Sequence, residues 1–165
     1  MLYFKNHRLY TQSFSFELPE DICLISDPAV VAPDRIIMET YDGRFQVDIG
    51  AEELDKTPYI KISQILADKE LEHIGNIFPI ERTGMKGYAS FYRDNEWSYE
   101  YYQECLGYPM NEDGQNGFVL TIIHEVDDEC QRGQIEMFMK QDNIRRMIES
   151  IRFEPEVCIR VMSAN

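Results

Sequence analysis

Three histidines are the residues whose side chains could most directly bind a metal ion or carry a proton. His7, His73 and His124 lie far apart in the sequence, and a metal site would need a second histidine, a cysteine or a carboxylate to converge on one of them. His124 lies on the same face of a predicted strand as Leu120 and Ile122, which is typical of a histidine in the core or at a sheet edge with its polar atoms satisfied. We therefore predict no bound structural metal.

Two acidic segments could bind a cation or take part in acid–base chemistry. The run Asn111–Gly117 does not fit the EF-hand calcium loop, because neither of its glycines stands at position six with acidic ligands at one, three and five. A surface turn between strands explains this run, and a solvated corner at a helix N-terminus explains residues 125–129. The sequence also contains no nucleophile elbow, phosphate loop, dinucleotide-binding glycine motif or zinc-protease motif. We therefore expect neither a cofactor nor an enzymatic activity.

Aromatic residues are unusually frequent between residues 88 and 108. Packing in the core explains at least half of them, but alternation along the strands must turn some tyrosines to the side opposite Trp97. Rigid aromatic side chains at a sheet surface suit contact with a protein or a small ligand. We therefore predict a solvent-facing binding surface made by Tyr99, Tyr101, Tyr102 and Tyr108.

The chain is strongly acidic, with 16 Lys and Arg against 30 Asp and Glu and a formal net charge of −14. This charge repels nucleic-acid phosphates and anionic lipid headgroups, so binding to nucleic acid and to membranes is disfavoured. The charge suits a protein partner with a basic surface, although solubility alone would also explain it.

Cysteine usage bears on the compartment. Cys23, Cys105, Cys130 and Cys158 are widely separated and include no Cys-x-x-Cys pair, so we expect neither a disulfide nor a zinc site. The first eight residues lack the apolar segment of a signal peptide, and no stretch approaches the roughly 18 apolar residues that span a bilayer. A signal removed from a longer product is the alternative. We predict a cytoplasmic protein.

The length and pattern of the chain favour one packed domain over residues 1–165. We expect an N-terminal strand or arm over residues 1–13 and a C-terminal tail over residues 154–165. Alternation of apolar and polar residues predicts a half-buried strand over residues 14–18, which Pro19 ends.

The middle of the chain predicts a hairpin, a helix and four strands. Asp42-Gly43 joins two alternating segments and predicts a hairpin with a type I′ turn. Thr57-Pro58 predicts the start of a helix that Gly75 would end. The later strands are expected at residues 77–83, 84–92, 97–105 and 117–126. The last of them is apolar on both faces, which is typical of a central strand.

The segment Gln134–Ile151 predicts helical structure with two apolar clusters on opposite faces. One straight helix could not bury both clusters against one sheet, so we expect a break near Gln141, with Asp142 as the N-cap of a second helix. The alternative is a single helix held between the sheet and another element or a partner.

The order of these patterns resembles PsbP-like and DcrB-like domains. Residues 14–19 are similar to the "F-x-F-x-hydrophobic-P" opening of these domains, and residues 84–89 to their glycine-containing strand. Residues 118–123 and 144–151 resemble the apolar strand and closing helix that follow. The likeness runs over residues 14–153.

The resemblance implies an α+β fold, an antiparallel β-sheet flanked by helices in an α/β/α sandwich. Members of the family include an extrinsic subunit of photosystem II and a nuclear transport regulator, and they act mostly by binding proteins. The family shares no catalytic motif, so no functional residue is carried over.

We therefore expect a non-enzymatic protein-interaction domain that uses an acidic, tyrosine-rich surface to bind a partner with a basic surface. The alternative is a small-ligand binder or enzyme with a cleft between the sheet and the helices, holding Tyr99, Tyr101 or His124. A deep pocket with convergent polar groups would favour this alternative.

Overall fold

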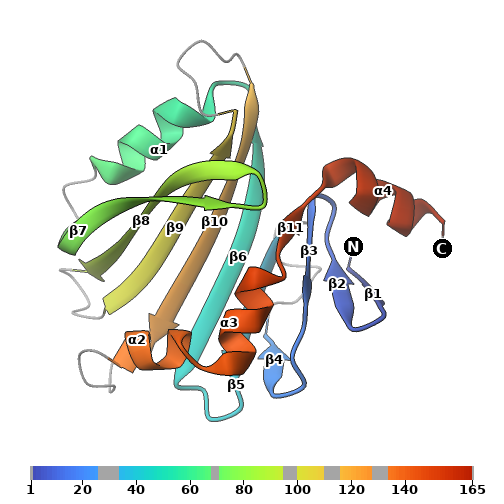
Figure 1. The fold of residues 1–165 in the computed structure, drawn as a ribbon, viewed down its shortest axis with the longest axis horizontal. Helices are drawn as coiled ribbons and strands as arrows, with labels where there is room; N and C mark the ends of the chain where they lie inside the picture. The colour runs from blue at the N-terminus through green and yellow to red at the C-terminus, as the bar shows by residue number, and fades with distance from the viewer. Residues whose placement is uncertain are drawn as a thin grey trace.

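A seven-stranded antiparallel sheet dominates the structure, a computed structural model that describes residues 2–25, 34–67, 71–94, 100–109, 116–127 and 134–164. The strand order is β4-β5-β6-β10-β9-β8-β7, and the sheet is strongly curved (Figure 1). Its strands are β4 (Ile22–Leu24), β5 (Arg35–Thr40), β6 (Phe45–Leu54), β7 (Leu71–Arg82), β8 (Met85–Asp94), β9 (Glu100–Tyr108) and β10 (Gly117–Val126).

A second, four-stranded sheet lies beside the first. Its order is β1-β2-β3-β11, with bounds β1 (Tyr3–Lys5), β2 (Arg8–Tyr10), β3 (Phe14–Glu17) and β11 (Arg152–Phe153). The predicted strand over residues 14–18 is therefore confirmed as β3, but it is not half-buried. Ser15 is as buried as Phe14 and Phe16, because β3 lies between β2 and β11 and packs into the main core.

The helices cover both faces of the large sheet, which confirms the predicted α+β class with an antiparallel sheet flanked by helices. The helices described are α1 (Pro58–Leu66), α2 (Gln134–Met139), α3 (Asp142–Glu149) and α4 (Pro155–Ser163). Ile62 of α1 packs with Cys105 and Val119 on one face. On the other face, Phe138 of α2 stacks on Phe45 with ring centroids 5.1 Å apart. None of these helices is long and apolar enough to cross a bilayer.

The central strand β10 explains the two-faced apolar pattern of residues 118–123. Leu120 and Ile122 are fully buried in the main core, and Val119 is buried against α1 on the opposite face. Phe118 is only half-buried, because it lies near the end of the strand, where it packs edge-on against Phe153 of β11.

Truncation of Leu120 to alanine is expected to lower the free energy of unfolding by about 2–5 kcal/mol, because the deleted atoms leave a cavity in a close-packed core. Urea unfolding would measure the loss. Ile159→Ala is the control, since Ile159 is 56% exposed on α4 and should change stability by less than about 0.5 kcal/mol. Equal losses in the two variants would contradict the placement of Leu120.

The hairpin predicted around Asp42-Gly43 is confirmed, since β5 pairs with β6, but its turn is not of type I′. The turn spans residues 41–44, and among these residues only Gly43 has a positive φ, of 70°. The Gly43 N–H donates to the Thr40 carbonyl at 2.8 Å, and the Asp42 carboxylate accepts from the Thr40 hydroxyl at 2.6 Å and from the Arg44 N–H at 3.1 Å. These bonds close the turn without a second left-handed residue.

The first helix begins at Pro58, as predicted, but ends at Leu66, and Gly75 does not end it. Residues 71–82 form β7, which is one of the two edge strands of the large sheet. The strand predicted over residues 77–83 is thus the second half of a longer one.

The predicted break in the C-terminal helical segment is confirmed between α2 and α3. The N-cap of α3 is Gln141, however, and Asp142 is its first helical residue. The segment expected as a C-terminal tail, residues 154–165, contains the helix α4. Pro155 begins this helix instead of ending the preceding structure, since a proline at the first helical position loses no intrahelical hydrogen bond.

Candidate functional site

Two of the four tyrosines predicted to form a binding surface are buried. Tyr101 is 8% exposed and Tyr102 5% exposed, whereas Tyr108 is 59% exposed. Tyr99 lies outside the described residues. The expectation that the tyrosines of this strand face solvent is therefore wrong for Tyr101 and Tyr102.

Both faces of β9 are covered, and this is why alternation did not expose either tyrosine. Tyr101 stacks on Tyr92 with ring centroids 5.2 Å apart. Tyr102 lies on the opposite face, 4.9 Å from Phe91 and 5.7 Å from His124 between ring centroids. The tyrosine-rich sequence therefore supplies core packing in this part of the sheet.

Tyr102 belongs to a buried polar cluster, which we define as Arg82, Tyr102, Glu104 and His124. The Glu104 carboxylate accepts hydrogen bonds from Arg82 Nε at 3.0 Å and Nη2 at 2.9 Å. It also accepts from the Tyr102 hydroxyl at 3.0 Å. Burial, together with the Glu104 carboxylate, raises the pKa of Tyr102 well above its ordinary value, so its hydroxyl stays a donor.

Within this cluster, His124 is a buried neutral imidazole. It is 2% exposed, and Nδ1 has no hydrogen-bond partner among the described residues. The histidine is therefore buried, as predicted, but its polar atoms are not all satisfied. Burial, and secondarily the Arg82 charge, lower the pKa of His124 to about 3.

The buried polar cluster holds the sheet together and does not form a reaction site. Glu104 is 3% exposed, and only Arg82 among the four has an appreciable exposed fraction. Arg82 reaches across β8 to Glu104 on β9, and β8 carries the small residues Ala89, opposite Glu104, and Gly87, between the positions opposite Glu104 and Arg82. A substrate could not contact the carboxylate or the imidazole without disrupting the core.

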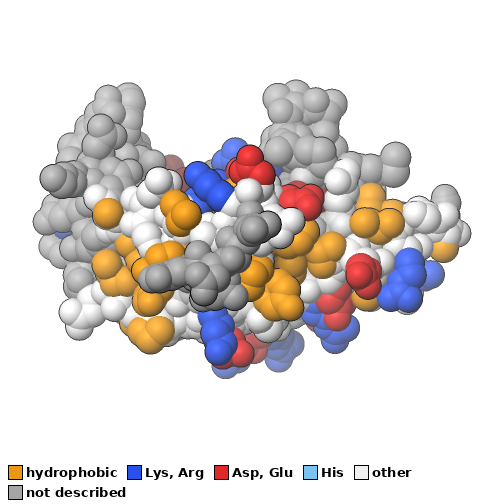
Figure 2. Space-filling model, turned by 90° about the horizontal axis from the view of Figure 1, so that it is seen from above, with side chains coloured by type: hydrophobic (Ala, Val, Ile, Leu, Met, Phe, Trp, Pro, Cys, Tyr) orange, Lys and Arg blue, Asp and Glu red, His pale blue; other side chains and the backbone are white. Residues whose placement is uncertain are grey.

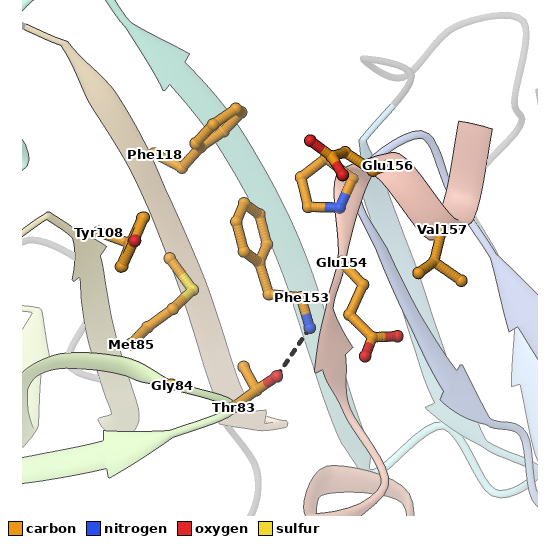
Figure 3. Close-up of a pocket in the computed structure, with 10 residues that line it drawn as sticks. Thr83, Gly84, Met85, Tyr108, Phe118, Phe153, Glu154, Glu156 and Val157 are labelled. Atoms are coloured by element: carbon orange, nitrogen blue, oxygen red, sulfur yellow. Dashed lines mark hydrogen bonds between the residues drawn. The ribbon is translucent and has the colours of Figure 1, made fainter. Parts of the chain in front are cut away.

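The exposed tyrosine, Tyr108, lines a cleft of about 590 Å³ at the end of the large sheet. We call it the C-terminal cleft, because β11 and α4 form one of its walls (Figure 3). The hairpin tip between β7 and β8 and the ends of β9 and β10 form the remainder. Its described lining residues are Thr83, Gly84, Met85, Tyr108, Phe118, Phe153, Glu154, Pro155, Glu156 and Val157.

Apolar side chains make up the interior of the C-terminal cleft. Phe118 and Phe153 meet edge to face, with ring centroids 5.1 Å apart. Figure 3 shows Met85 and Tyr108 on one side of these two rings and Val157 on the other. From above, apolar side chains gather in the middle of this face of the molecule, with both acidic and basic groups around them (Figure 2).

The hairpin tip is fixed to the opposite wall of the C-terminal cleft. Thr83 Oγ1 accepts a hydrogen bond from the Phe153 N–H at 2.8 Å. Thr83 has a φ of 51°, a left-handed conformation that is uncommon for a β-branched residue. This hydrogen bond helps to hold the strained turn in place, so the geometry of the cleft depends on contacts between distant parts of the chain.

The charged groups at the C-terminal cleft are carboxylates. Glu154 and Glu156 are both exposed, and the described lining residues include no Lys or Arg. The N-terminus of α4 lies at the same place, and its dipole has the opposite sign. Two full negative charges outweigh a helix terminus of roughly half a positive charge, so the electrostatic potential there favours cations.

The two buried cysteines, Cys105 and Cys158, lack the features of catalytic nucleophiles. Burial raises the pKa of Cys105 and of Cys158 to about 11, so both stay protonated thiols near neutral pH. Cys23, Cys105 and Cys158 are free thiols, and Cys130 lies outside the described residues. Within the described ranges, no three His, Cys, Asp or Glu side chains converge as metal ligands would.

Sequence patterns identified Tyr108 but not the cleft around it. Most residues opposite Tyr108 come from the segment expected to be a C-terminal tail, residues 154–165. The sequence does contain a signal for a helix in this segment, because Pro155 is followed by Val157, Cys158 and Val161 at helical spacing. The convergence of Thr83, Tyr108 and Phe153 depends on tertiary structure and has no local signal.

The fold and the cleft define an α+β domain with an open apolar site and no assembled catalytic group among the described residues. No protein-family model and no curated protein matches the chain. Among solved structures, the fold is similar to that of LpqN, a protein involved in cell envelope biogenesis of Mycobacterium tuberculosis. The TM-score is 0.54 at 15% sequence identity, over 86% of this chain and 83% of LpqN. At this identity the likeness establishes the fold alone.

Proposed function

We propose that this chain is a non-enzymatic domain that binds another protein through the C-terminal cleft. The observation that carries the proposal is an exposed tyrosine over an apolar cleft, with two carboxylates beside it. Exposed aromatic side chains around an apolar depression are typical anchors of protein interfaces. Tyr108 thus keeps the binding role predicted for the tyrosine surface, whereas Tyr101 and Tyr102 stabilise the core.

The net charge of −14 supports a partner with a basic surface. Low salt would favour association with such a partner, because opposite charges are then screened less. We further propose that the domain acts in the cytoplasm and that it belongs to the PsbP-like and DcrB-like group. The sequence resemblance over residues 14–153 supports this membership, and so does the shared type of fold. Because members of that group act mostly by binding proteins, the membership agrees with the proposed role.

A small-ligand binder is the second candidate, and the size of the C-terminal cleft favours it. A cleft of about 590 Å³ falls within the roughly 300–1,000 Å³ of ligand pockets. Of the residues first expected to hold such a ligand, Tyr101 and His124 do not line this cleft, because both are buried in the core, and Tyr99 lies outside the described residues.

Replacement of Tyr108 by alanine should reduce recovery of the physiological partner at least tenfold when the tagged chain is used for affinity capture from native cells. An anchor of this kind contributes about 2 kcal/mol or more to binding. Tyr41→Ala is the matched control, since Tyr41 is 71% exposed outside the C-terminal cleft. Mass spectrometry with isotope labels would give the ratios.

The partner should remain bound to the Tyr41 variant and be lost from the Tyr108 variant, and raised salt should slow its association. A partner captured equally by both variants would argue against the C-terminal cleft as the contact site. Recovery of nucleic acid in place of protein would contradict the proposed class of partner.

A further inference from the structure

We infer that the C-terminal cleft accepts an extended peptide segment in which an apolar side chain is followed directly by Lys or Arg. The inference rests on the proposed function and specifies the chemistry of the partner. It depends on three features of the cleft, namely its apolar interior, its charge and the exposure of its rim.

The interior of the C-terminal cleft suits one apolar side chain of the partner. Met85 is nearly fully buried, and its neighbours Phe118 and Phe153 are half-buried, so their remaining exposed surface is apolar. A side chain placed against the two phenylalanine rings, above the buried Met85, would remove that surface from water, which is the main favourable term in such contacts. Tyr108 could pack alongside the same side chain and keep its hydroxyl in solvent.

The charges beside this interior select basic neighbours in the segment. Glu154 precedes α4 and Glu156 lies in its first turn, and neither carboxylate takes part in a salt bridge with another described residue. In Figure 3 both carboxylates lie beyond the phenylalanine rings, on the same side as Val157. A basic residue next to the apolar anchor could therefore reach a carboxylate, whereas an acidic residue there would be repelled.

The exposure of the rim favours a peptide segment over an enclosed small molecule. Tyr108 is 59% exposed, and both glutamates are exposed, so the cleft does not surround its occupant. Small ligands usually bury most of their surface in a pocket. A peptide can insert one side chain and leave its backbone and flanking residues partly in water.

Two short peptides with the same anchor and opposite charges test the inference on the native chain. The probes are acetyl-Phe-Lys-Lys-amide and acetyl-Phe-Glu-Glu-amide, titrated against the ¹⁵N-labelled protein and followed by chemical shifts. We expect the basic peptide to bind at least about tenfold more tightly than the acidic one at low salt. The shifts should centre on Gly84, Tyr108 and Val157.

Removal of the two carboxylates should abolish most of this preference. In the double variant Glu154→Gln/Glu156→Gln, we expect the two peptides to differ by less than about threefold. The control Glu136→Gln/Glu149→Gln changes the net charge by the same amount at exposed positions on α2 and α3. It should keep the tenfold preference, which separates a local effect of the cleft from the overall charge.

Equal binding of the two peptides, tighter binding of the acidic one, or no binding of either would overturn the inferred segment chemistry. None of these outcomes would affect a partner whose capture depends on Tyr108. Conversely, loss of that dependence in the capture experiment would reject the proposed function, whatever the peptides do. Because the peptide comparison uses the unmodified chain, it does not depend on whether the variants fold.

Discussion

Replacement of Arg82 by methionine should lower the free energy of unfolding by about 3–5 kcal/mol, because it leaves a buried carboxylate without its counter-charge. The Glu104 side chain is 4% exposed and its partner Arg82 is 23% exposed, so Glu104 cannot replace the lost interaction with water. The Tyr102 hydroxyl would remain its only described hydrogen-bond donor. Urea unfolding at neutral pH would measure the loss.

The double variant Arg82→Met/Glu104→Gln is the matched control for this prediction. The amide keeps an acceptor for the Tyr102 hydroxyl but carries no charge, so its burial is far less unfavourable than that of a carboxylate. We expect the double variant to be at least about 1.5 kcal/mol more stable than Arg82→Met alone, since a buried charge is the main source of the loss. If the double variant were no more stable, the loss would reflect side-chain packing of Arg82 and not the unpaired charge.

The elements that the sequence predicted well are those with strong local patterns. The two-faced apolar run of residues 118–123 identified the central strand β10, and its bounds are the predicted ones. Opposite apolar faces within Gln134–Ile151 identified the break between α2 and α3. In both cases the pattern shows which sides of the element are buried. Only one placement of the element in the fold buries those sides.

The wrong predictions involve positions where burial comes from distant segments. Alternation along β9 could assign Tyr101 and Tyr102 to opposite faces, but it could not show that both faces are covered. Similarly, Ser15 is buried on a strand that lies between β2 and β11, and β11 comes from more than 130 residues further along the chain. Local patterns carry no information on such contacts.

The C-terminal cleft was missed for the same reason, and one local signal was also misinterpreted. Pro155 can end a helix or begin one, and it begins α4 within the segment that was expected to be a C-terminal tail. The apolar surface of the cleft is shared among four strands and a helix, so no single segment of the sequence shows it. Of the residues that line the cleft, only Tyr108 was selected from composition, together with three other tyrosines of the same segment, because tyrosines are frequent at interfaces.

The unpartnered histidine leads to the second large effect, a loss of stability in mild acid. The pKa of His124 is lowered from 6.5 to about 3 in the folded chain, first by burial and then by Arg82. Below pH 6.5 the unfolded chain therefore binds a proton that the folded chain does not bind. The stability associated with the neutral imidazole is fully present above pH 6.5, and it is lost by roughly 1.4 kcal/mol per pH unit as the pH falls toward 3.

Other titrating groups change stability over the same pH range, so a difference between two proteins is needed to isolate His124. Glu125 has a raised pKa because of burial and the nearby Asp48 carboxylate. Its protonation therefore raises the stability of the folded chain as the pH falls, which is opposite to the effect of His124. His124→Phe keeps an aromatic ring between Phe45 and Tyr102 and leaves Glu125 unchanged. The pH dependence that the two proteins share then cancels in the comparison.

Urea unfolding of the parent chain and of His124→Phe between pH 7.5 and pH 5 should show this difference directly. We expect the parent to lose about 2 kcal/mol more than the variant over this interval, since only the parent must keep an imidazole uncharged. Parallel stability curves would mean that His124 is protonated in the folded chain. Its Nδ1 would then have to find an acceptor such as the Glu104 carboxylate, and the buried polar cluster would contain two cations sharing one anion.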